Sequence, residues 1–233
     1  MSFTTITLDG PAGAGKSTIA KELAYRLKFY SLNTGSIYRT IAYKYLQLNN
    51  PNLDDGEVLS NFVSSLNIKV FYNGAGTQCM VLDGVDVTEK LRSHDVNAVV
   101  AKISPYYTIR EYTKQMQRKI GQCYDIVAEG RDVGTEVFPN ATHKFYVTAS
   151  AEVRAQRRLT DFMKVQGETI KYMEVLEQIK QRDQDDTNRE YGALRQAENA
   201  ILVDTSNNTV AQSVDLLVDI IKTKSKSMIP PTK

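Results

Sequence analysis

Nine residues near the beginning of the chain have the types and the spacing of a phosphate-binding loop. They match the pattern Gly-x-x-x-x-Gly-Lys-Ser and are Gly10-Pro11-Ala12-Gly13-Ala14-Gly15-Lys16-Ser17-Thr18. The glycines let successive backbone N–H groups turn inward around an anion, and a helix that begins near Lys16 adds the positive end of its dipole. Lys16 would reach the β- and γ-phosphates of a nucleoside triphosphate, and the Ser17 hydroxyl would be one ligand of Mg²⁺. The sequence therefore predicts a site for a nucleoside triphosphate with its metal ion.

Arginine recurs in three further polar clusters, and its guanidinium group binds phosphate oxygens with two hydrogen bonds at once. The clusters span residues 34–39, 130–135 and 182–189. Taken singly, an arginine in any of them fits a solvated helix face. Together with the glycine loop, arginines from several loops suit an enzyme that holds two mutually repelling phosphates in line. The clusters therefore favour phosphoryl transfer.

Five short apolar runs predict the elements that position these clusters. The runs cover residues 5–8, 29–32, 126–128, 144–147 and 200–203, and each ends in polar or glycine residues. Helical patterns lie between the runs, so the alternation predicts an α/β fold in which a five-stranded parallel sheet is covered by helices on both faces, in three α/β/α layers. Ligands of such folds gather beyond the carboxyl ends of the strands, so we expect the polar clusters to meet at one edge.

One region interrupts this alternation. After a predicted helix over residues 57–66, three short runs at 68–72, 78–82 and 85–87 are joined by tight turns that contain glycine. Strands joined in this way form an antiparallel meander. Inside an α/β chain, the meander indicates a small insertion beside the phosphate loop, where it would help to choose a substrate.

The composition suits one globular unit whose partners are small anions. The chain has 233 residues, of which 42% are hydrophobic and 24% charged, and its net charge of +2 gives no reason to expect a nucleic-acid or membrane surface. No apolar stretch is long enough to cross a bilayer, and the first residues lack a basic flank, so we expect a cytoplasmic protein. Cys79 and Cys123 lack metal-ligand or redox spacing. We expect a single domain over residues 1–233 with a mobile tail at 225–233 and an amphipathic closing helix over 209–224.

Taken together, the motifs resemble the bacterial cytidylate kinases, within the nucleoside monophosphate kinases, over nearly the whole chain. The glycine loop is shared by many enzymes, whereas the combination of Gly-Arg-Asp-x-Gly-Thr with the inserted meander is specific. The matching segments are residues 8–11, 34–39, 82–88, 92, 110, 129–135, 137–139, 182–186 and 188–189. The resemblance implies a P-loop kinase fold in which the meander, at about residues 60–95, is an antiparallel NMP-binding subdomain and residues 151–190 form a helical lid.

The resemblance also implies roles on the acceptor side, where CMP or dCMP would bind. Arg39 and Arg131 would take the α-phosphate of the acceptor. Arg182 and Asp186 would hold its ribose. A carboxylate can accept from the exocyclic amine of cytosine while a guanidinium donates to its ring nitrogen and carbonyl, which distinguishes cytosine from uracil. The resemblance implies that cytosine is contacted by Thr34, Arg110, Asp132 and Arg189. Tyr38 would belong to the same substrate site.

On the donor side, the resemblance implies that residues 10–18 bind ATP and that arginines of the lid close over it. Arg154, Arg157 and Arg158 follow the fourth strand, and helix residues that are three and four apart, as Arg154 is from the other two, also form surface salt bridges. Arg157 would contact ATP, and Arg158 would stabilise the transferring phosphoryl group together with Lys16 and Arg131.

The implied reaction is direct in-line transfer of the γ-phosphoryl group of ATP to the α-phosphate of CMP. The nucleophile is already an anion at neutral pH, so the enzyme needs no strong general base and forms no covalent intermediate. Glu129 or Asp132 could hold Mg²⁺ through water. Asp132 therefore has two candidate roles, base recognition and metal binding, between which the sequence does not decide.

Three other functions stay open at this point. The nearest is a P-loop kinase for another small acceptor, such as dTMP, AMP or shikimate, although the meander and residues 130–132 favour cytidylate. A nucleotide-hydrolysing switch is disfavoured because the chain has no Asn-Lys-x-Asp motif. A binding module without turnover would leave the arginine clusters without a role. Around Ala101, some relatives carry a serine that this chain lacks, and this difference leaves the preference for ribose or deoxyribose open. We also expect a monomer.

Overall fold

The five apolar runs form one parallel sheet, in the strand order β2-β6-β1-β7-β8. The computed structural model describes residues 3–74, 76–165 and 171–227. Strand β1 pairs on one side with β6, where Asp9 lies opposite Gly130, and on the other side with β7. The phosphate loop and the segment after β6 therefore leave the sheet side by side, as the α/β prediction requires. The bounds are β1 (Thr5–Asp9), β2 (Tyr30–Asn33), β6 (Ile126–Gly130), β7 (His143–Thr148) and β8 (Ile201–Asp204).

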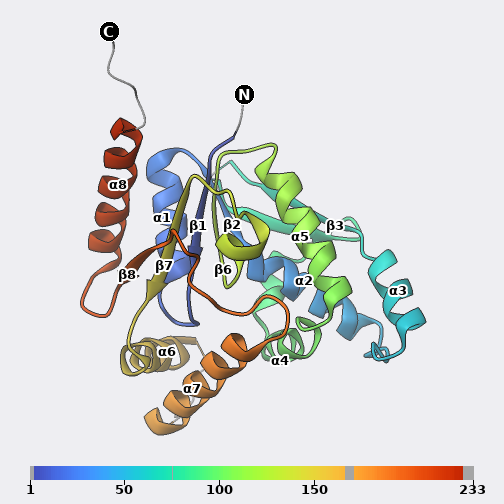
Figure 1. Cartoon of the computed structure of the whole chain (residues 1–233). Coiled ribbons are helices and arrows are strands. Elements are labelled where there is room, and N and C mark those ends of the chain that lie inside the picture. Colours follow the sequence, from blue (N-terminus) through green and yellow to red (C-terminus); the bar gives the residue numbers. More distant parts are fainter. Residues whose placement is uncertain (1–2, 75, 166–170, 228–233) are drawn as a thin grey trace.

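Helices cover both faces of this sheet, which confirms the predicted three layers (Figure 1). Successive side chains of a strand point to opposite faces. Val127 accordingly packs in the core formed with α1 (Lys16–Leu27) and α8 (Val210–Ser227), whereas Ile126 and Ala128 pack in the core on the other face. Helix α8 ends at Ser227, three residues beyond the predicted end, and the rest of the predicted tail, residues 228–233, lies outside the described residues.

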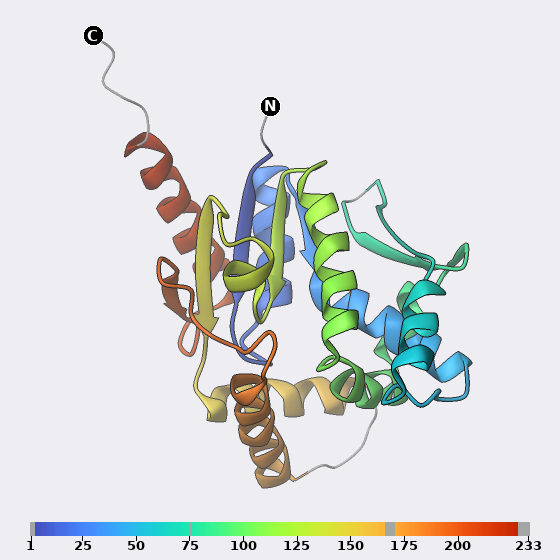
Figure 2. The same cartoon turned by 45° about the vertical axis from the view of Figure 1, so that its right-hand side comes forward.

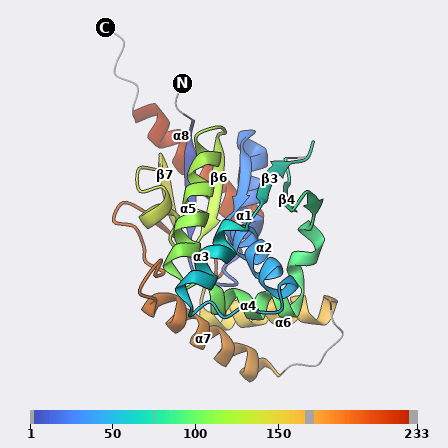
Figure 3. The same ribbon diagram turned by 90° about the vertical axis from the view of Figure 1, so that its right-hand side faces the viewer.

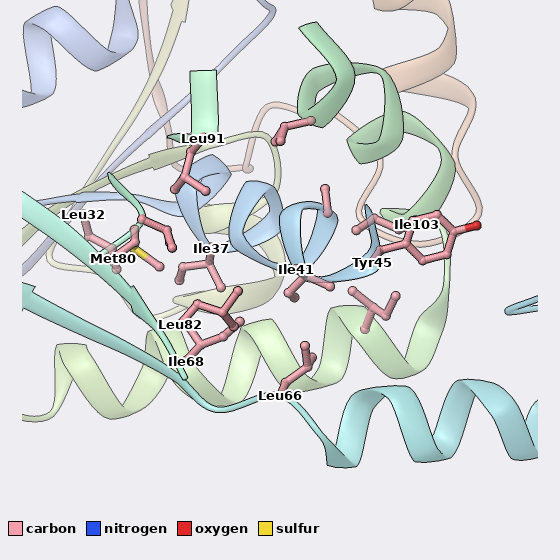
Figure 4. Close-up of a cluster of buried hydrophobic side chains, with 14 of the residues drawn as sticks. Leu32, Ile37, Ile41, Tyr45, Leu66, Ile68, Met80, Leu82, Leu91 and Ile103 are labelled. Atoms are coloured by element: carbon pink, nitrogen blue, oxygen red, sulfur yellow. The ribbon is translucent and has the colours of Figure 1, made fainter. Parts of the chain in front are cut away.

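The meander is the expected three-stranded antiparallel sheet, in the order β3-β4-β5. Its buried side chains Ile68, Met80 and Leu82 share one hydrophobic core with Ile37 and Ile41 of the helix that follows β2 (Figure 4). The small sheet is therefore packed against that helix through a shared hydrophobic core, in addition to being connected to it along the chain. The bounds are α2 (Thr34–Gln47), α3 (Gly56–Ser64), β3 (Ile68–Tyr72), β4 (Gln78–Leu82) and β5 (Val85–Asp86).

One polar side chain of the small sheet reaches the start of α2. The Gln78 amide oxygen accepts from the backbone N–H of Asn33 at 2.6 Å, and its amide nitrogen donates to the Asn33 carbonyl at 3.3 Å. The Asn33 side chain in turn caps α2 by accepting from the N–H of Ser36 at 3.0 Å. The insertion is thus hydrogen-bonded to the first turn of the helix that carries Thr34 and Arg39.

The remaining helices lie at the carboxyl end of the sheet and along the face opposite α1 and α8. Figures 2 and 3 show that α6 and α7 lie across this end, and Figure 3 places α4 beside them. A small core of its own joins α6 to α7. Within the described part of the chain, no helix is long and apolar enough to cross a membrane. The bounds are η1 (Thr88–Arg92), α4 (His94–Ile103), α5 (Tyr107–Gly121), η2 (Val133–Val137), α6 (Ala151–Val165) and α7 (Tyr172–Asn188).

Candidate active site

The phosphate loop passes so close to the sheet that its first glycine has no room for a side chain. A Cβ atom on Gly10 would lie 1.9 Å from the carbonyl oxygen of Val147, and its φ of +147° suits glycine alone. Gly15, which precedes α1, has a φ of +84°. The Lys16 ammonium is buried and donates to the Pro11 carbonyl at 2.7 Å. The loop therefore curls around its own lysine, with glycines at the positions where its backbone needs a positive φ.

A cavity of about 690 Å³ opens at this end of the sheet. Every predicted site residue except Gly10 and Pro11 lines it, so the six separate segments that carry these residues meet as the polar clusters suggested. The wall opposite the phosphate loop is formed by side chains from α2, from the segment after β6, and from α6 and α7. The phosphate loop and this wall thus form two sides of one cavity, so one ligand could bind at the loop and a second one opposite it.

The wall opposite the loop is crowded with positive charge. Arg39, Arg131, Arg158 and Arg182 lie close enough for their charges to interact. Burial, with Arg131 as the largest like-charged neighbour, lowers the pKa of Arg182 to about 10. Burial likewise lowers the pKa of Arg39, against a smaller raising effect of Glu129. Buried like charges favour binding of an anion that neutralises them, so the charge of this wall is suited to a second phosphate group.

One buried carboxylate forms ion pairs with two guanidinium groups, those of Arg131 and Arg189. Asp186, 1% exposed, accepts from Arg131 Nε at 2.7 Å and pairs with Arg189 Nη2 at 2.5 Å. Burial raises its pKa, but the charges of Arg131, Arg189 and Arg182 outweigh burial and hold the pKa below its usual value. Asp186 is therefore ionised at neutral pH and fixes the orientation of the arginines around it.

A second ion pair lies deeper in the same wall. Arg110, 8% exposed, pairs with the Asp132 carboxylate. The Arg110 guanidinium also lies 5.8 Å from the ring centre of Tyr38, whose hydroxyl accepts from Thr113 at 2.9 Å. The Thr34 hydroxyl donates to the Glu129 carbonyl at 2.9 Å, which leaves its oxygen able to accept. A donor, an acceptor and a flat aromatic face thus line one pocket, as recognition of a planar base requires.

The donors at the loop fit a magnesium ion. The Ser17 hydroxyl donates to the Glu129 carboxylate at 2.7 Å, so two hard oxygen ligands already face each other beside the phosphate loop. Asp132, in contrast, is engaged with Arg110. Glu129 thus lies within hydrogen-bond distance of Ser17, whereas the partner of Asp132 is Arg110.

Sequence reasoning gave no role to Asp9, which joins the phosphate loop to the segment after β6. One carboxylate oxygen accepts from the N–H of Val133 at 2.8 Å and the other from the N–H of Gly134 at 2.6 Å. A Cβ atom on Gly134 would lie 2.7 Å from the Thr7 hydroxyl, so the close approach depends on glycine. The sequence did offer one signal for this role, since Asp9 is a single charged residue at the end of an apolar run.

Replacing Asp9 by asparagine is expected to reduce the pH dependence of folding stability. Burial raises the Asp9 pKa from 3.8 to about 6, although its backbone hydrogen bonds lower it. A carboxyl group with a raised pKa stabilises the fold fully below pH 4, and this contribution, about 3 kcal/mol, is lost as the pH rises through 6. Denaturant unfolding at pH 4 to 7 should therefore show a steeper loss of stability in the wild type than in Asp9→Asn. Parallel curves would mean that Asp9 does not titrate in this range.

Three arginines of α6 behave differently from one another. Arg157 and Arg158 line the cavity, and Arg157 donates to the Thr205 carbonyl at 2.7 Å. Arg154 lies outside the cavity wall and pairs instead with Asp183. The cavity also has lining residues that the sequence analysis did not select, among them Ser104 and Asn208. The polar residues that follow β8 were the signal for Asn208, since ligands gather where parallel strands end.

The fold and the cavity define a P-loop nucleotide-binding protein in which a cluster of arginine side chains faces the loop. A family model described as cytidylate kinase matches residues 6–223. The chain therefore belongs to the cytidylate kinase family.

Individual relatives agree with this assignment. A cytidylate kinase of Clostridium botulinum (strain Okra) is 43% identical over 218 residues, which are 94% of this chain and 97% of that protein. A cytidylate kinase of Carboxydothermus hydrogenoformans is 42% identical over 220 residues, 94% of this chain and 98% of that protein. An uncharacterized protein from Eubacterium ventriosum, known from a crystal structure, covers 94% of this chain and 98% of its own with a TM-score of 0.53. At 13% identity, that likeness concerns the fold alone.

Proposed function

We propose that the protein is a cytidylate kinase that transfers the γ-phosphoryl group of ATP to CMP or dCMP, giving ADP and CDP or dCDP. Membership of the family and the names of the relatives support this function. The observation that carries it is the crowding of four guanidinium groups opposite the phosphate loop. A site for one nucleotide needs one cluster of positive charge, whereas transfer between two nucleotides needs two that face each other.

On the donor side, residues 10–18 would wrap the phosphates of ATP. Lys16 would bind the β- and γ-phosphates, and Arg157 and Arg158 would approach from α6. Ser17 would hold Mg²⁺, with Glu129 beside it. When bound, the ion neutralises charge on the β- and γ-phosphates. The helices of residues 151–190 would act as a lid that excludes water from this reaction.

On the acceptor side, Arg39 and Arg131 would bind the α-phosphate of CMP, and Arg182 with Asp186 would hold its ribose. The insertion at about residues 60–95 would support this side through α2. Recognition of cytosine follows from the ion pair in the deep pocket, which offers a carboxylate to the exocyclic amine and a guanidinium to the ring. The residues assigned to the base are Thr34, Tyr38, Arg110, Asp132 and Arg189.

Catalysis would then consist of positioning and charge stabilisation. The acceptor phosphate is an anion at neutral pH, so no residue has to remove a proton from it. Lys16, Arg131 and Arg158 would surround the phosphoryl group in flight and stabilise the charge on its equatorial oxygens. We further propose a monomer that acts in the cytoplasm on small molecules, with no nucleic-acid or membrane partner.

Replacing Arg39 by methionine is expected to raise the KM for CMP by about tenfold or more, because a charged hydrogen-bond donor to phosphate is worth about 1.5–3 kcal/mol. The KM for ATP should change little. Arg39 donates to Asn97 at 3.1 Å through Nε, and this contact is to a side chain of another helix rather than to the loop. The exposed Arg195 offers a matched control. Unaltered CMP kinetics in Arg39→Met would leave Arg39 as a structural residue.

The first test is an assay of ADP release from ATP and Mg²⁺ with CMP, dCMP, UMP, AMP, dTMP and shikimate offered singly, beside a control without acceptor. We expect fast release with CMP and dCMP, and their ratio measures the sugar preference. Release with another acceptor alone would move the substrate assignment and keep phosphoryl transfer. Release without acceptor would indicate a nucleotide-hydrolysing switch.

A further inference from the structure

One buried guanidinium group joins the phosphate loop to the helix that carries the acceptor arginines. Arg154, 5% exposed, lies in the first turn of α6. Its Nε donates to the Ala149 carbonyl at 2.9 Å, and its Nη1 donates to the carbonyl of Ala12, within the phosphate loop, at 3.2 Å. The same group forms a fork with both carboxylate oxygens of Asp183 on α7, at 2.9 and 2.6 Å. Three segments far apart in the sequence thus meet on one side chain.

We propose that Arg154 is a positioning residue that fixes the phosphate loop and α7 relative to each other. This inference rests on the proposed function, since it concerns the two substrates of that reaction. Asp183 stands next to Arg182 and one turn before Asp186, which both line the cavity. The Arg154–Asp183 pair therefore sets how far the acceptor side chains of α7 stand from the loop that holds ATP.

The contacts of Arg154 are those of a residue that positions other segments, not those of a catalytic group. Its donors are directed at two backbone carbonyls and one carboxylate, and it does not line the cavity, unlike Arg157 and Arg158 from the same helix. Its stem also contacts the loop, because a Cβ atom on Gly13 would lie 3.2 Å from the Arg154 Cβ. A bidentate pair of this kind is directional, and because Arg154 is buried the pair is screened less than an exposed one.

In-line transfer makes the relative position of the two substrates decisive. The attacking oxygen and the phosphorus atom must approach to roughly 3–3.5 Å, and a misplacement of about 1 Å is enough to lower the rate substantially. A residue that bonds to both the donor loop and the acceptor helix controls this distance without touching either substrate. Loss of the pair should therefore affect both substrates together.

Steady-state kinetics of Arg154→Lys, Arg154→Met, Asp183→Asn and the Arg154→Met/Asp183→Asn double variant test the proposal. We expect Arg154→Met and Asp183→Asn each to raise the KM for ATP and the KM for CMP and to lower kcat, with kcat/KM for CMP falling by about tenfold or more. Because the two residues act as one unit, the double variant should be no worse than the worse single variant. Arg154→Lys, which keeps the charge but loses the fork, should fall between wild type and Arg154→Met.

Arg26→Met supplies the matched control, since it removes a surface ion pair with Glu22 and Asp215 that lies outside this cavity. Thermal unfolding measures the folded fraction of each variant. A rise in only one of the two KM values would overturn the proposal, as would additive losses in the double variant. A lower Tm with unchanged kinetics per folded molecule would reduce Arg154 to a purely structural role. If the wild type proves to use another acceptor, the proposed function fails, and the same variants tested with that acceptor still decide whether the loop and α7 are coupled.

Discussion

Replacement of Lys16 by alanine is expected to lower kcat by about a thousandfold while the protein stays folded. Lys16 is the only side chain of the loop motif that carries a positive charge, and its ammonium lies inside the curl of the loop where the transferring phosphates would pass. Removing one preorganised donor from a transition state typically costs about 10²- to 10³-fold in rate. The loss should appear in single-turnover transfer from ATP to CMP.

Stability gives this prediction an internal control. Burial, and then the charge of Arg131, lowers the pKa of Lys16 to about 7, so the surroundings of Lys16 within the protein disfavour the ammonium form. Lys16→Ala should consequently unfold at the same temperature as the wild type or above it, without nucleotide, and should lose the stabilisation that ATP confers. The exposed Lys21 on α1 provides Lys21→Ala as a matched variant, which should keep full activity. Near-normal kcat in Lys16→Ala would remove the lysine from catalysis.

Replacement of Asp132 by asparagine is expected to reduce the preference for CMP over UMP, measured as the ratio of the two kcat/KM values, by at least about tenfold. The carboxylate only accepts hydrogen bonds, whereas an amide can turn its NH₂ group toward the uracil carbonyl. A well-placed pair of base contacts is worth about 1–3 kcal/mol of discrimination. Burial raises the Asp132 pKa, while Arg110 opposes it and keeps the carboxylate paired.

The same variant separates the two candidate roles of Asp132. If the residue recognises the base, Asp132→Asn should keep the wild-type dependence on Mg²⁺ concentration, whereas Glu129→Gln should shift that dependence. Asp185, whose carboxylate accepts from Gln181 at 2.9 Å on the exposed side of α7, supplies Asp185→Asn as a control. An unchanged CMP-to-UMP ratio together with a shifted Mg²⁺ requirement would assign Asp132 to the metal.

Much of the fold follows from local patterns because each strand is a short apolar run that ends in polar residues. The runs located all eight strands of the two sheets within one or two residues. Strand order is different, since the pairing of β1 with β6 joins residues about 120 positions apart and no local signal records it. The meeting of the polar clusters at one edge was expected from the parallel sheet, whereas the roles of single residues came from the family resemblance.

The sequence could not assign a role to side chains whose role depends on which neighbouring element they point toward. Arg154, Arg157 and Arg158 share one helix and similar spacing, yet only the latter two line the cavity. The distinction arises because the first turn of α6 lies against the phosphate loop and α7, so the contacts of Arg154 come from three distant segments. Gln78 is a similar case, because its partner Asn33 lies 45 positions away.

The strand order has a consequence for how the protein is made. Both neighbours of β1 in the sheet, β6 and β7, follow it by more than a hundred residues, and β2 pairs with β6. While the chain leaves the ribosome, β1 has no partner strand until residues 126–148 have been synthesised, although the glycine loop emerges directly after β1. A bound nucleotide therefore cannot stabilise the nascent chain early, and the apolar strand β1 has to be kept from aggregating while more than a hundred further residues are synthesised.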